Sequence, residues 1–307
     1  MSAAATHRTL IIALGANIGI AAAKFVAAAI TGSSAMLTEG VHSLVDSTNQ
    51  LLLMWGRHAA KRPPDARHPF GRGRELYFWS FVVAVLVFAL GAGVSVYEGV
   101  VHILEPEPAV SPYVAYGVLL IAFLLEGGST LAAARGFRAA KGDLGWLEAV
   151  RRSKDPPSFI VLLEDSAAMA GILVAAIGLA LSQATGNPFF DGAASVVIGL
   201  ILGATAWLLA VESKALLIGE AAHPALVEGI CAAAAAQPGV VGVGEVRTVH
   251  SAPDQITVTM SADFDDSITA GEVERIVAAI EAEVAARWPD VKRLYIRPQQ
   301  GAHRPTL

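Results

Sequence analysis

Residues 33–56 read SSAMLTEGVHSLVDSTNQLLLMWG, and this stretch shows how the N-terminal part of the chain is built. It is long and mostly apolar, and its ionisable side chains recur at helical spacing. It is one of six apolar runs, which lie near 9–31, 33–56, 76–103, 112–135, 157–183 and 188–213. Each run has about the 20 residues that an α-helix needs to cross roughly 30 Å of hydrocarbon. The sequence therefore predicts an all-α membrane bundle of six transmembrane helices.

The overall composition agrees with a membrane protein and excludes several other classes. Of the 307 residues, 16% are charged, whereas about 25% is usual in soluble domains. A net charge of −5 argues against a nucleic-acid partner. The single cysteine, Cys231, excludes a disulfide framework and a zinc site built from cysteines. The apolar stretch after Arg8 is too long for a signal peptide.

The charges of the loops predict how the bundle is oriented. The loops expected after the second and fourth runs are rich in Lys and Arg, whereas the other three contain neither residue. Cytoplasmic loops are enriched in Lys and Arg, so both basic loops and both termini are expected in the cytoplasm. An even number of spans agrees with termini that share a side. We expect a multi-pass protein of the cell membrane.

The chain changes character after residue 216, which predicts domains at 1–216 and 217–307. Residues 1–216 carry equal numbers of acidic and basic side chains, so the net negative charge lies in 217–307. The later part alternates as helix, strand, strand, helix and strand, near 224–236, 240–249, 255–262, 268–288 and 292–296. This order predicts a soluble cytoplasmic α+β domain in which both helices cover one face of a small sheet.

Ionisable side chains at membrane depth are costly and mark a pathway or a binding site. The second run has the most, with Glu39, His42, Asp46 and Asn49 on a stripe about 80° wide along one helix face. His42 and Asp46 are four residues apart, so that an imidazole and a carboxylate can hold one cation.

Three carboxylates from three different runs are expected at one depth. Asp46, Asp165 and Glu126 each lie about 12 to 15 Å from the inner end of their run. Glu164 precedes Asp165 in the fifth run. These residues form the candidate metal site together with His42.

Structural roles are the alternative for several of these residues. The stripe from Glu39 to Asn49 could serve helix–helix hydrogen bonding. Glu126 could form a buried pair with Lys24, or Lys24 could extend its ammonium group to the membrane surface. Interfacial solvation or helix capping accounts more simply for the acidic residues near the ends of the runs, which are Glu98, Asp191 and Glu212.

The mixture of ligand types favours a first-row divalent metal. Imidazole binds zinc and iron well, and carboxylates extend the range to manganese. Magnesium and calcium prefer sites made only of oxygen. Protons compete with a metal for histidine and carboxylate ligands. We therefore expect metal–proton exchange by alternating access.

Five segments are informative when taken together: KFVAAAITGSSAMLTEGVHSLVD at 24–46, HPFGRGRELYF at 68–78, YEGVVHILEP at 97–106, EDSAAMAG at 164–171 and DGAASVVIG at 191–199. Together they resemble the cation diffusion facilitator family of zinc transporters. The resemblance implies six transmembrane helices, a cytoplasmic ferredoxin-like domain, a homodimer and proton-driven export of divalent cations.

The resemblance also implies which residues bind the transported metal. The family uses two ligands four residues apart on the second span and two on the fifth. The first pair corresponds to His42 and Asp46, and the later member of the second pair corresponds to Asp165. The earlier member falls on Val161, which cannot bind metal. Glu164 or Glu126 is the candidate replacement, and otherwise water fills the position. Glu39 and Asn49 then line the pathway or support the ligands.

Accessory metal sites of the family are altered in this sequence. The loop site after the second span matches Asp65 and His68, but Arg72 stands where a later histidine belongs. The last strand ends Ile296-Arg297-Pro298-Gln299 without the expected His-Asp pair. His250 is expected to be a solvated loop residue, and Asp263 is the other remaining candidate. We therefore expect little or no metal in the C-terminal domain, which would serve dimerisation. This pattern resembles the divergent zinc-transporter-9-like branch.

The sequence thus predicts a secondary transporter, not an enzyme, which exports a divalent cation with zinc as first candidate and needs no cofactor. An iron or manganese exporter of the same fold is the alternative within transport. A membrane scaffold that does not transport is the alternative from another class, because Val161, Arg72 and Arg297 occupy altered metal positions.

Overall fold

The computed structural model describes residues 3–105 and 112–301, and only the backbone at 3–13, 16 and 112. The outer loop expected between the third and fourth spans lies largely outside these residues. Two compact units are present. The first consists of Met1–His58 with Phe78–Lys214, and the second of Ala59–Tyr77 with Ala215–Leu307. The domain division at 216/217 stays a prediction, and the structure groups the loop 59–77 with the C-terminal unit.

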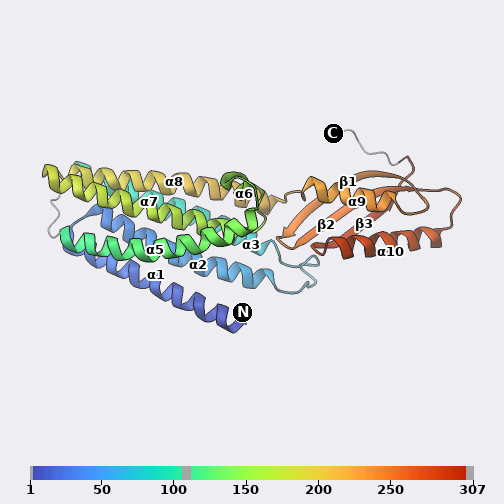
Figure 1. Ribbon diagram of the computed structural model, residues 1–307, viewed down its shortest axis with the longest axis horizontal. Coiled ribbons are helices and arrows are strands. Elements are labelled where there is room, and N and C mark those ends of the chain that lie inside the picture. The colour runs from blue at the N-terminus through green and yellow to red at the C-terminus, as the bar shows by residue number, and fades with distance from the viewer. Residues whose placement is uncertain (1–2, 106–111, 302–307) are drawn as a thin grey trace. The chain divides into compact units, whose positions relative to one another are not determined.

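The first unit is built from long helices that lie along a common direction (Figure 1). Segments α3, η1 and α4 continue one another from Glu75 to Leu104. The elements are α1 (Ala3–Thr31), α2 (Ser34–Ala60), α3 (Glu75–Leu86), the π-helical η1 (Val87–Ala92), α4 (Gly93–Leu104), α5 (Pro112–Lys141), α6 (Trp146–Arg152), α7 (Pro156–Thr185) and α8 (Phe189–Ile218).

Four of the described helical segments are long and apolar enough to cross a membrane. They are Glu75–Leu104, Tyr113–Lys141, Pro156–Thr185 and Phe189–Ile218. The other two expected spans coincide with α1 and α2. In the described residues α1 supplies a shorter apolar stretch, Asn17–Thr31, and α2 carries the polar stripe. The protein is therefore mostly helical, and the number of six spans stays a prediction.

Small residues allow α4 and α8 to approach closely. A Cβ added at Gly99 would lie 2.7 Å from the backbone oxygen of Gly192, and one added at Gly192 would lie 2.9 Å from the backbone oxygen of Gly99. Membrane helices use such residues because close backbone approach increases van der Waals contact. Apolar side chains from α1, α2, α5, α7 and α8 share one core, which includes Met36, Leu119 and Leu202.

Asp191 of α8 caps the first turn of α2. Its carboxylate accepts hydrogen bonds from the Ser33 hydroxyl at 2.8 Å and from the Ser34 backbone N–H at 2.7 Å. The first N–H groups of a helix have no partner within that helix, and a carboxylate there also suits the helix dipole. Of the two roles expected for Asp191, the structure shows capping.

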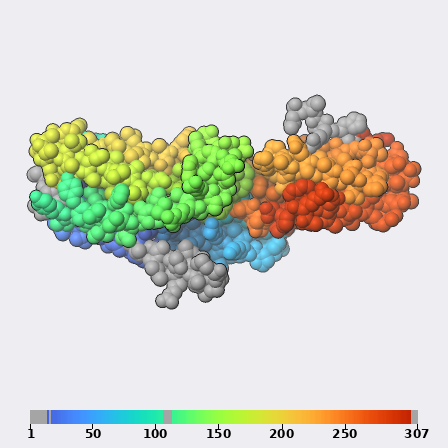
Figure 2. Space-filling model, in the orientation of Figure 1, coloured from blue at the N-terminus to red at the C-terminus, as the bar shows by residue number. Residues whose placement is uncertain are grey.

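The short helix α6 was not expected from the sequence. It lies in the basic loop between α5 and α7, with Ala149 and Val150 buried and Trp146 and Leu147 exposed. Its seven residues are too few for helical periodicity to identify. In the space-filling view, α5, α6 and α7 contribute to the visible face of this bundle (Figure 2).

The second unit has the predicted α-β-β-α-β order: α9 (Pro224–Ala235), β1 (Val240–Ala252), β2 (Gln255–Phe264), α10 (Ala270–Arg287) and β3 (Val291–Pro298). The sheet order is β1-β2-β3, with β1 antiparallel and β3 parallel to β2. Helices α9 and α10 run along the strands (Figure 1) and share one apolar core with them, as the sequence predicts. Thr269 and Glu272 form a capping box that starts α10.

Loop 59–77 is fastened to this sheet by Arg293 of β3. The guanidinium donates hydrogen bonds to the backbone oxygens of Pro69 at 3.3 Å and Phe70 at 3.2 Å. It also lies 4.8 Å from the centre of the Phe70 ring, a cation–π distance. A Cβ at Gly73 would lie 2.5 Å from the backbone oxygen of Ser251. The loop therefore packs closely against β1 and β3.

Candidate metal site

The polar stripe of α2 faces the interior of the helical bundle. Glu39, His42, Asp46 and Asn49 are all at most 9% exposed. Charged and polar groups are stable in such a place only when they are paired or bind an ion. Their hydrogen-bond and ion-pair partners on other helices lie on α1 and α7 of the same unit.

His42 and Asp46 form the centre of the candidate site. His42 Nε2 lies 3.4 Å from Asp46 Oδ2. Neither ring nitrogen of His42, nor Asp46 Oδ1, has a hydrogen-bond partner within residues 3–105 and 112–301. Buried polar atoms nearly always have a partner, so unpaired ones call for an explanation. An imidazole and a carboxylate with free lone pairs are suitable ligands for a divalent transition metal.

Asp165 approaches this centre from α7. Its Oδ2 accepts a hydrogen bond of 2.7 Å from the hydroxyl of Ser129 on α5. The charge of Asp165 acts on both His42 and Asp46, as does the charge of Glu126. The acidic groups of three helices are thus near enough to His42 to interact electrostatically. Their role as ligands stays a prediction.

Glu164 faces a different partner from Asp165. Its Oε1 accepts a hydrogen bond of 2.8 Å from the side-chain amide of Asn49, which joins α7 to α2. The two residues were expected separately, Glu164 as a candidate ligand and Asn49 on the pathway wall. Successive helical residues point about 100° apart, which explains why Glu164 and Asp165 have different neighbours.

Lys24 is a buried residue of this cluster, and its pairing differs from the expected one. Its ammonium group lies 3.0 Å from Glu39 Oε2 and donates a hydrogen bond of 2.8 Å to Ser43. Neither alternative left open by the sequence is found: Lys24 pairs with Glu39 and not with Glu126, and it is fully buried instead of reaching the membrane surface. Gly171 leaves room for Glu39, because a Cβ there would lie 2.4 Å from Glu39 Oε1. Glu39 therefore neutralises Lys24.

The described ranges contain no group of three or more His, Cys, Asp or Glu close enough to hold a metal ion. The ligands that are in reach of one another are His42 and Asp46, both on α2. Completing a coordination sphere therefore requires α7 or α5 to bring a carboxylate closer. Val161, one turn before Asp165, supplies no donor.

The accessory positions of the loop 59–77 form an ion-paired turn. Asp65 Oδ2 lies 2.8 Å from Arg72 Nη2, and Asp65 Oδ1 lies 3.1 Å from His68 Nδ1. The Arg72 guanidinium, followed by the His68 backbone N–H, lowers the pKa of Asp65 below its usual range. A cation of the chain itself thus occupies the place where the family resemblance implied a metal ligand.

The C-terminal candidates are structural in what the structure describes of them. His250 is buried in β1 and its Nδ1 lies 3.4 Å from the backbone oxygen of Ala252. The expectation of a solvated loop histidine is therefore wrong, because β1 extends beyond the predicted strand end. Asp263 accepts a hydrogen bond from the Gly301 backbone N–H at 2.9 Å.

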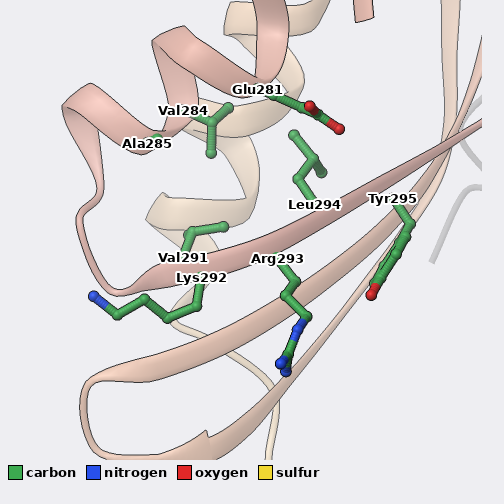
Figure 3. A pocket seen from close by; sticks show the side chains of 8 residues that line it. All are labelled: Glu281, Val284, Ala285, Val291, Lys292, Arg293, Leu294 and Tyr295. Atoms are coloured by element: carbon green, nitrogen blue, oxygen red, sulfur yellow. The ribbon is translucent and has the colours of Figure 1, made fainter. Parts of the chain in front are cut away.

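A hollow of about 310 Å³ lies between α10 and β3 in the C-terminal unit. Leu294 points towards α10, whereas Arg293 and Tyr295 point away from it (Figure 3). Glu281 is the one carboxylate among the lining residues. This hollow offers no set of metal ligands.

Comparison with known proteins assigns both units to one family. The cation efflux transmembrane domain matches residues 10–218, and the cytoplasmic domain of cation efflux proteins matches 222–298. The chain belongs to the cation diffusion facilitator family. Its members are cation transporters, and this member is a multi-pass membrane protein.

Curated relatives of this family member include several that are named for metals. The mitochondrial proton-coupled zinc antiporter SLC30A9 of Xenopus laevis is 34% identical over 80% of this chain and 44% of its own length. Metal tolerance protein C4 of Arabidopsis thaliana is 35% identical over 70% of this chain and 48% of its own length. The magnetosome protein MamM of Magnetospirillum gryphiswaldense is 25% identical over 87% of this chain and 80% of its own length. The chain spans less than half the length of the first two.

The sequence identified the polar stripe of α2 and left a buried Lys24 open, but it missed Glu39 as the partner of Lys24 and the contact of Ser129 with Asp165. Lys24 had a signal, because it is a lone cation in an apolar run. Ser129 had none, since serine is common in membrane helices for packing reasons.

Proposed function

We propose that this protein exports a divalent transition-metal cation, with zinc as the first candidate, in exchange for protons. The observation that carries the proposal is the pair His42 and Asp46, whose ring nitrogens and carboxylate oxygen Oδ1 are buried without hydrogen-bond partners in the described residues. A divalent cation would satisfy these atoms. The names of the zinc antiporter relatives support zinc as the substrate.

Asp165 is the third ligand of the proposed site, and Glu126 is the candidate fourth. Both act electrostatically on His42. Glu126 has no hydrogen bond or ion pair from its carboxylate to the part of the chain that the structure describes, which leaves it able to turn towards the metal. Glu164 is the other candidate, and it must first release Asn49. Glu39 supports the site by pairing with Lys24, and Asn49 supports it by its hydrogen bond to Glu164.

Exchange with protons follows from the chemistry of these ligands. Histidine must be neutral and carboxylates ionised to bind a metal, so a metal and protons compete for the same atoms. A site that opens alternately to either side would therefore release metal where protons are more abundant. The proposal requires helix movement, since the described residues do not hold three ligands together.

The proposal includes six spans, with α1 and α2 as the first two, and both termini in the cytoplasm of a cell-membrane protein. It also includes a homodimer formed through the C-terminal domain, which the match to the cytoplasmic domain of cation efflux proteins supports. An iron or manganese exporter is the alternative substrate assignment, because imidazole and carboxylates also suit these metals.

The test is zinc-driven proton movement in proteoliposomes that contain a pH-sensitive dye. The wild-type protein should move protons when a zinc gradient is applied, and Asp46→Ala combined with Asp165→Ala should abolish this flux. Thr48→Ala is the matched control, because Thr48 is an exposed neighbour on α2 whose side chain, within the described residues, bonds to the backbone oxygen of Leu44 of its own helix. Competition by iron and manganese in the same vesicles ranks the substrates.

Two results would contradict the proposal. Zinc flux that is unchanged in the double variant would remove the site. A wild-type protein without flux, and without saturable, pH-dependent zinc binding by calorimetry, would favour the alternative of a membrane scaffold. Val161, Arg72 and Arg297 are the residues that favour this alternative, since each occupies an altered metal position.

A further inference from the structure

A small basic cavity lies in the C-terminal unit, apart from the candidate metal site. Its volume is about 210 Å³, and residues of loop 59–77 line it together with Ser251 of β1. The lining includes His68, Arg72 and Arg74, with Glu75 as the one carboxylate among the lining residues. Two guanidinium groups and an imidazole thus surround a space large enough for a small oxyanion.

Hydrogen-bond donors in this cavity are left without acceptors. Arg72 Nε is buried without a partner, although Arg72 Nη2 bonds to Asp65. The Arg74 guanidinium is exposed to solvent, and neither it nor the Ser251 hydroxyl has a hydrogen bond or ion pair to the residues described. Arginine suits phosphate because its planar donors match the spacing of phosphate oxygens.

The walls of the cavity are held in place from two sides. Arg293 fixes Pro69 and Phe70 to β3, and the ion pair between Asp65 and Arg72 closes the turn. Gly71 has a φ of +84°, which a residue with a side chain rarely adopts. Gly73 lies too close to Ser251 for any side chain. The backbone of the loop and the Arg72 guanidinium are therefore positioned before a ligand arrives, which reduces the entropy lost on binding.

We propose that this cavity binds a phosphate group, with Arg72, Arg74 and the Ser251 hydroxyl as its donors. The phosphate belongs to a soluble phosphate compound or to the headgroup of a phospholipid. Either one would neutralise Arg74, accept the unpaired Arg72 Nε–H and join loop 59–77 to β1, so that the segment leading from α2 to α3 becomes more rigid. The site is independent of the proposed metal transport.

The test uses the full-length protein in neutral detergent and in nanodiscs, with chloride as background salt. Inorganic phosphate is titrated by calorimetry in detergent. In nanodiscs, hydrogen exchange of residues 66–76 is compared between phosphatidylcholine alone and phosphatidylcholine with phosphatidic acid. We expect saturable phosphate binding, or slower exchange with phosphatidic acid, and the arm that responds identifies the source of the phosphate.

Arg74→Gln is the diagnostic variant, since Arg74 is exposed and its loss should not disturb the fold. It should weaken phosphate affinity at least tenfold or abolish the protection by phosphatidic acid. Arg67→Gln is the matched control, because it removes the same charge from an exposed position in the same loop that does not line the cavity. No response in either arm, or equal effects of both variants, would overturn the proposal.

Discussion

At the scale of single residues, Lys24 has the most unusual environment among the charged residues of the described bundle. It is a fully buried cation whose ammonium group contacts the Glu39 carboxylate and the Ser43 hydroxyl. Burying two charges costs several kcal/mol for each ion, and their attraction offsets this cost only when the geometry is good. The ion pair therefore links α1 to α2 close to the candidate ligand His42.

We predict that Lys24→Met lowers the free energy of unfolding by about 3–5 kcal/mol, because it leaves the Glu39 carboxylate buried without a counter-charge. The double variant Lys24→Met with Glu39→Gln should recover most of this loss. Unfolding in detergent, followed by circular dichroism, measures both. Lys214→Met is the control, since Lys214 is exposed. A single variant as stable as this control would contradict the pairing.

At the scale of elements, the fit between α4 and α8 depends on two glycines that face one another. The backbone of each helix occupies the place that a Cβ of the other would need. Asp191 of α8 also caps α2. Helix α8 therefore contacts both α2, which carries His42, and α4, which follows the π-helical segment Val87–Ala92. Such segments are frequent at functional sites, where the regular helix is interrupted.

We predict that Gly99→Ala lowers the free energy of unfolding by about 1–3 kcal/mol, the usual cost of overpacking. A new methyl group would meet backbone atoms of Gly192 and Val196 at 2.7 Å, and backbone atoms move less easily than a side chain. The measurement is again unfolding in detergent.

Gly117→Ala provides the comparison at this scale, because a Cβ at Gly117 of α5 has no neighbour within 4 Å. Alanine has a higher helix propensity than glycine, so this variant should be as stable as the wild type or slightly more stable. If Gly99→Ala and Gly117→Ala had the same stability, the close packing of α4 against α8 would be refuted.

At the scale of the whole molecule, the distribution of Lys and Arg among the loops predicts how the spans are oriented in the membrane. The basic loops predict one arrangement, with loop 59–77 in the cytoplasm and the turn after α7 on the other side. The chain has a single cysteine, Cys231, so new cysteines can be placed on a Cys231→Ala background without ambiguity.

We predict that Ala66→Cys and Ala184→Cys are labelled from opposite sides of the membrane. A maleimide that does not cross membranes should label Ala184→Cys in intact cells and Ala66→Cys only in inverted vesicles. Both alanines are exposed, so their reactivity should report location and not burial. Labelling of both positions from one side would contradict the three spans that the proposed topology places between them.

The sequence by itself determined the long helices of the bundle, but not the short helix α6, together with the order of the C-terminal elements and the polar stripe of α2. These features depend on periodicity, on length and on the cost of placing charge in hydrocarbon, which are properties of short segments. Spacing and depth along the apolar runs indicated the candidate ligands His42, Asp46 and Asp165, and the family motifs added Val161 as the altered ligand position. The strands and α9 and α10 agree with the prediction within a few residues.

Only the tertiary structure decided which buried groups meet. Lys24 could have paired with Glu126 or Glu39, and Glu164 could have pointed to His42 or to Asn49, since sequence spacing does not determine the rotation of one helix against another. The packing of loop 59–77 against β1 and β3 could not be predicted from the sequence either, because Arg293 and Phe70 are 223 positions apart. Contacts between distant segments depend on packing, which makes the neighbours of each side chain a property of the folded molecule.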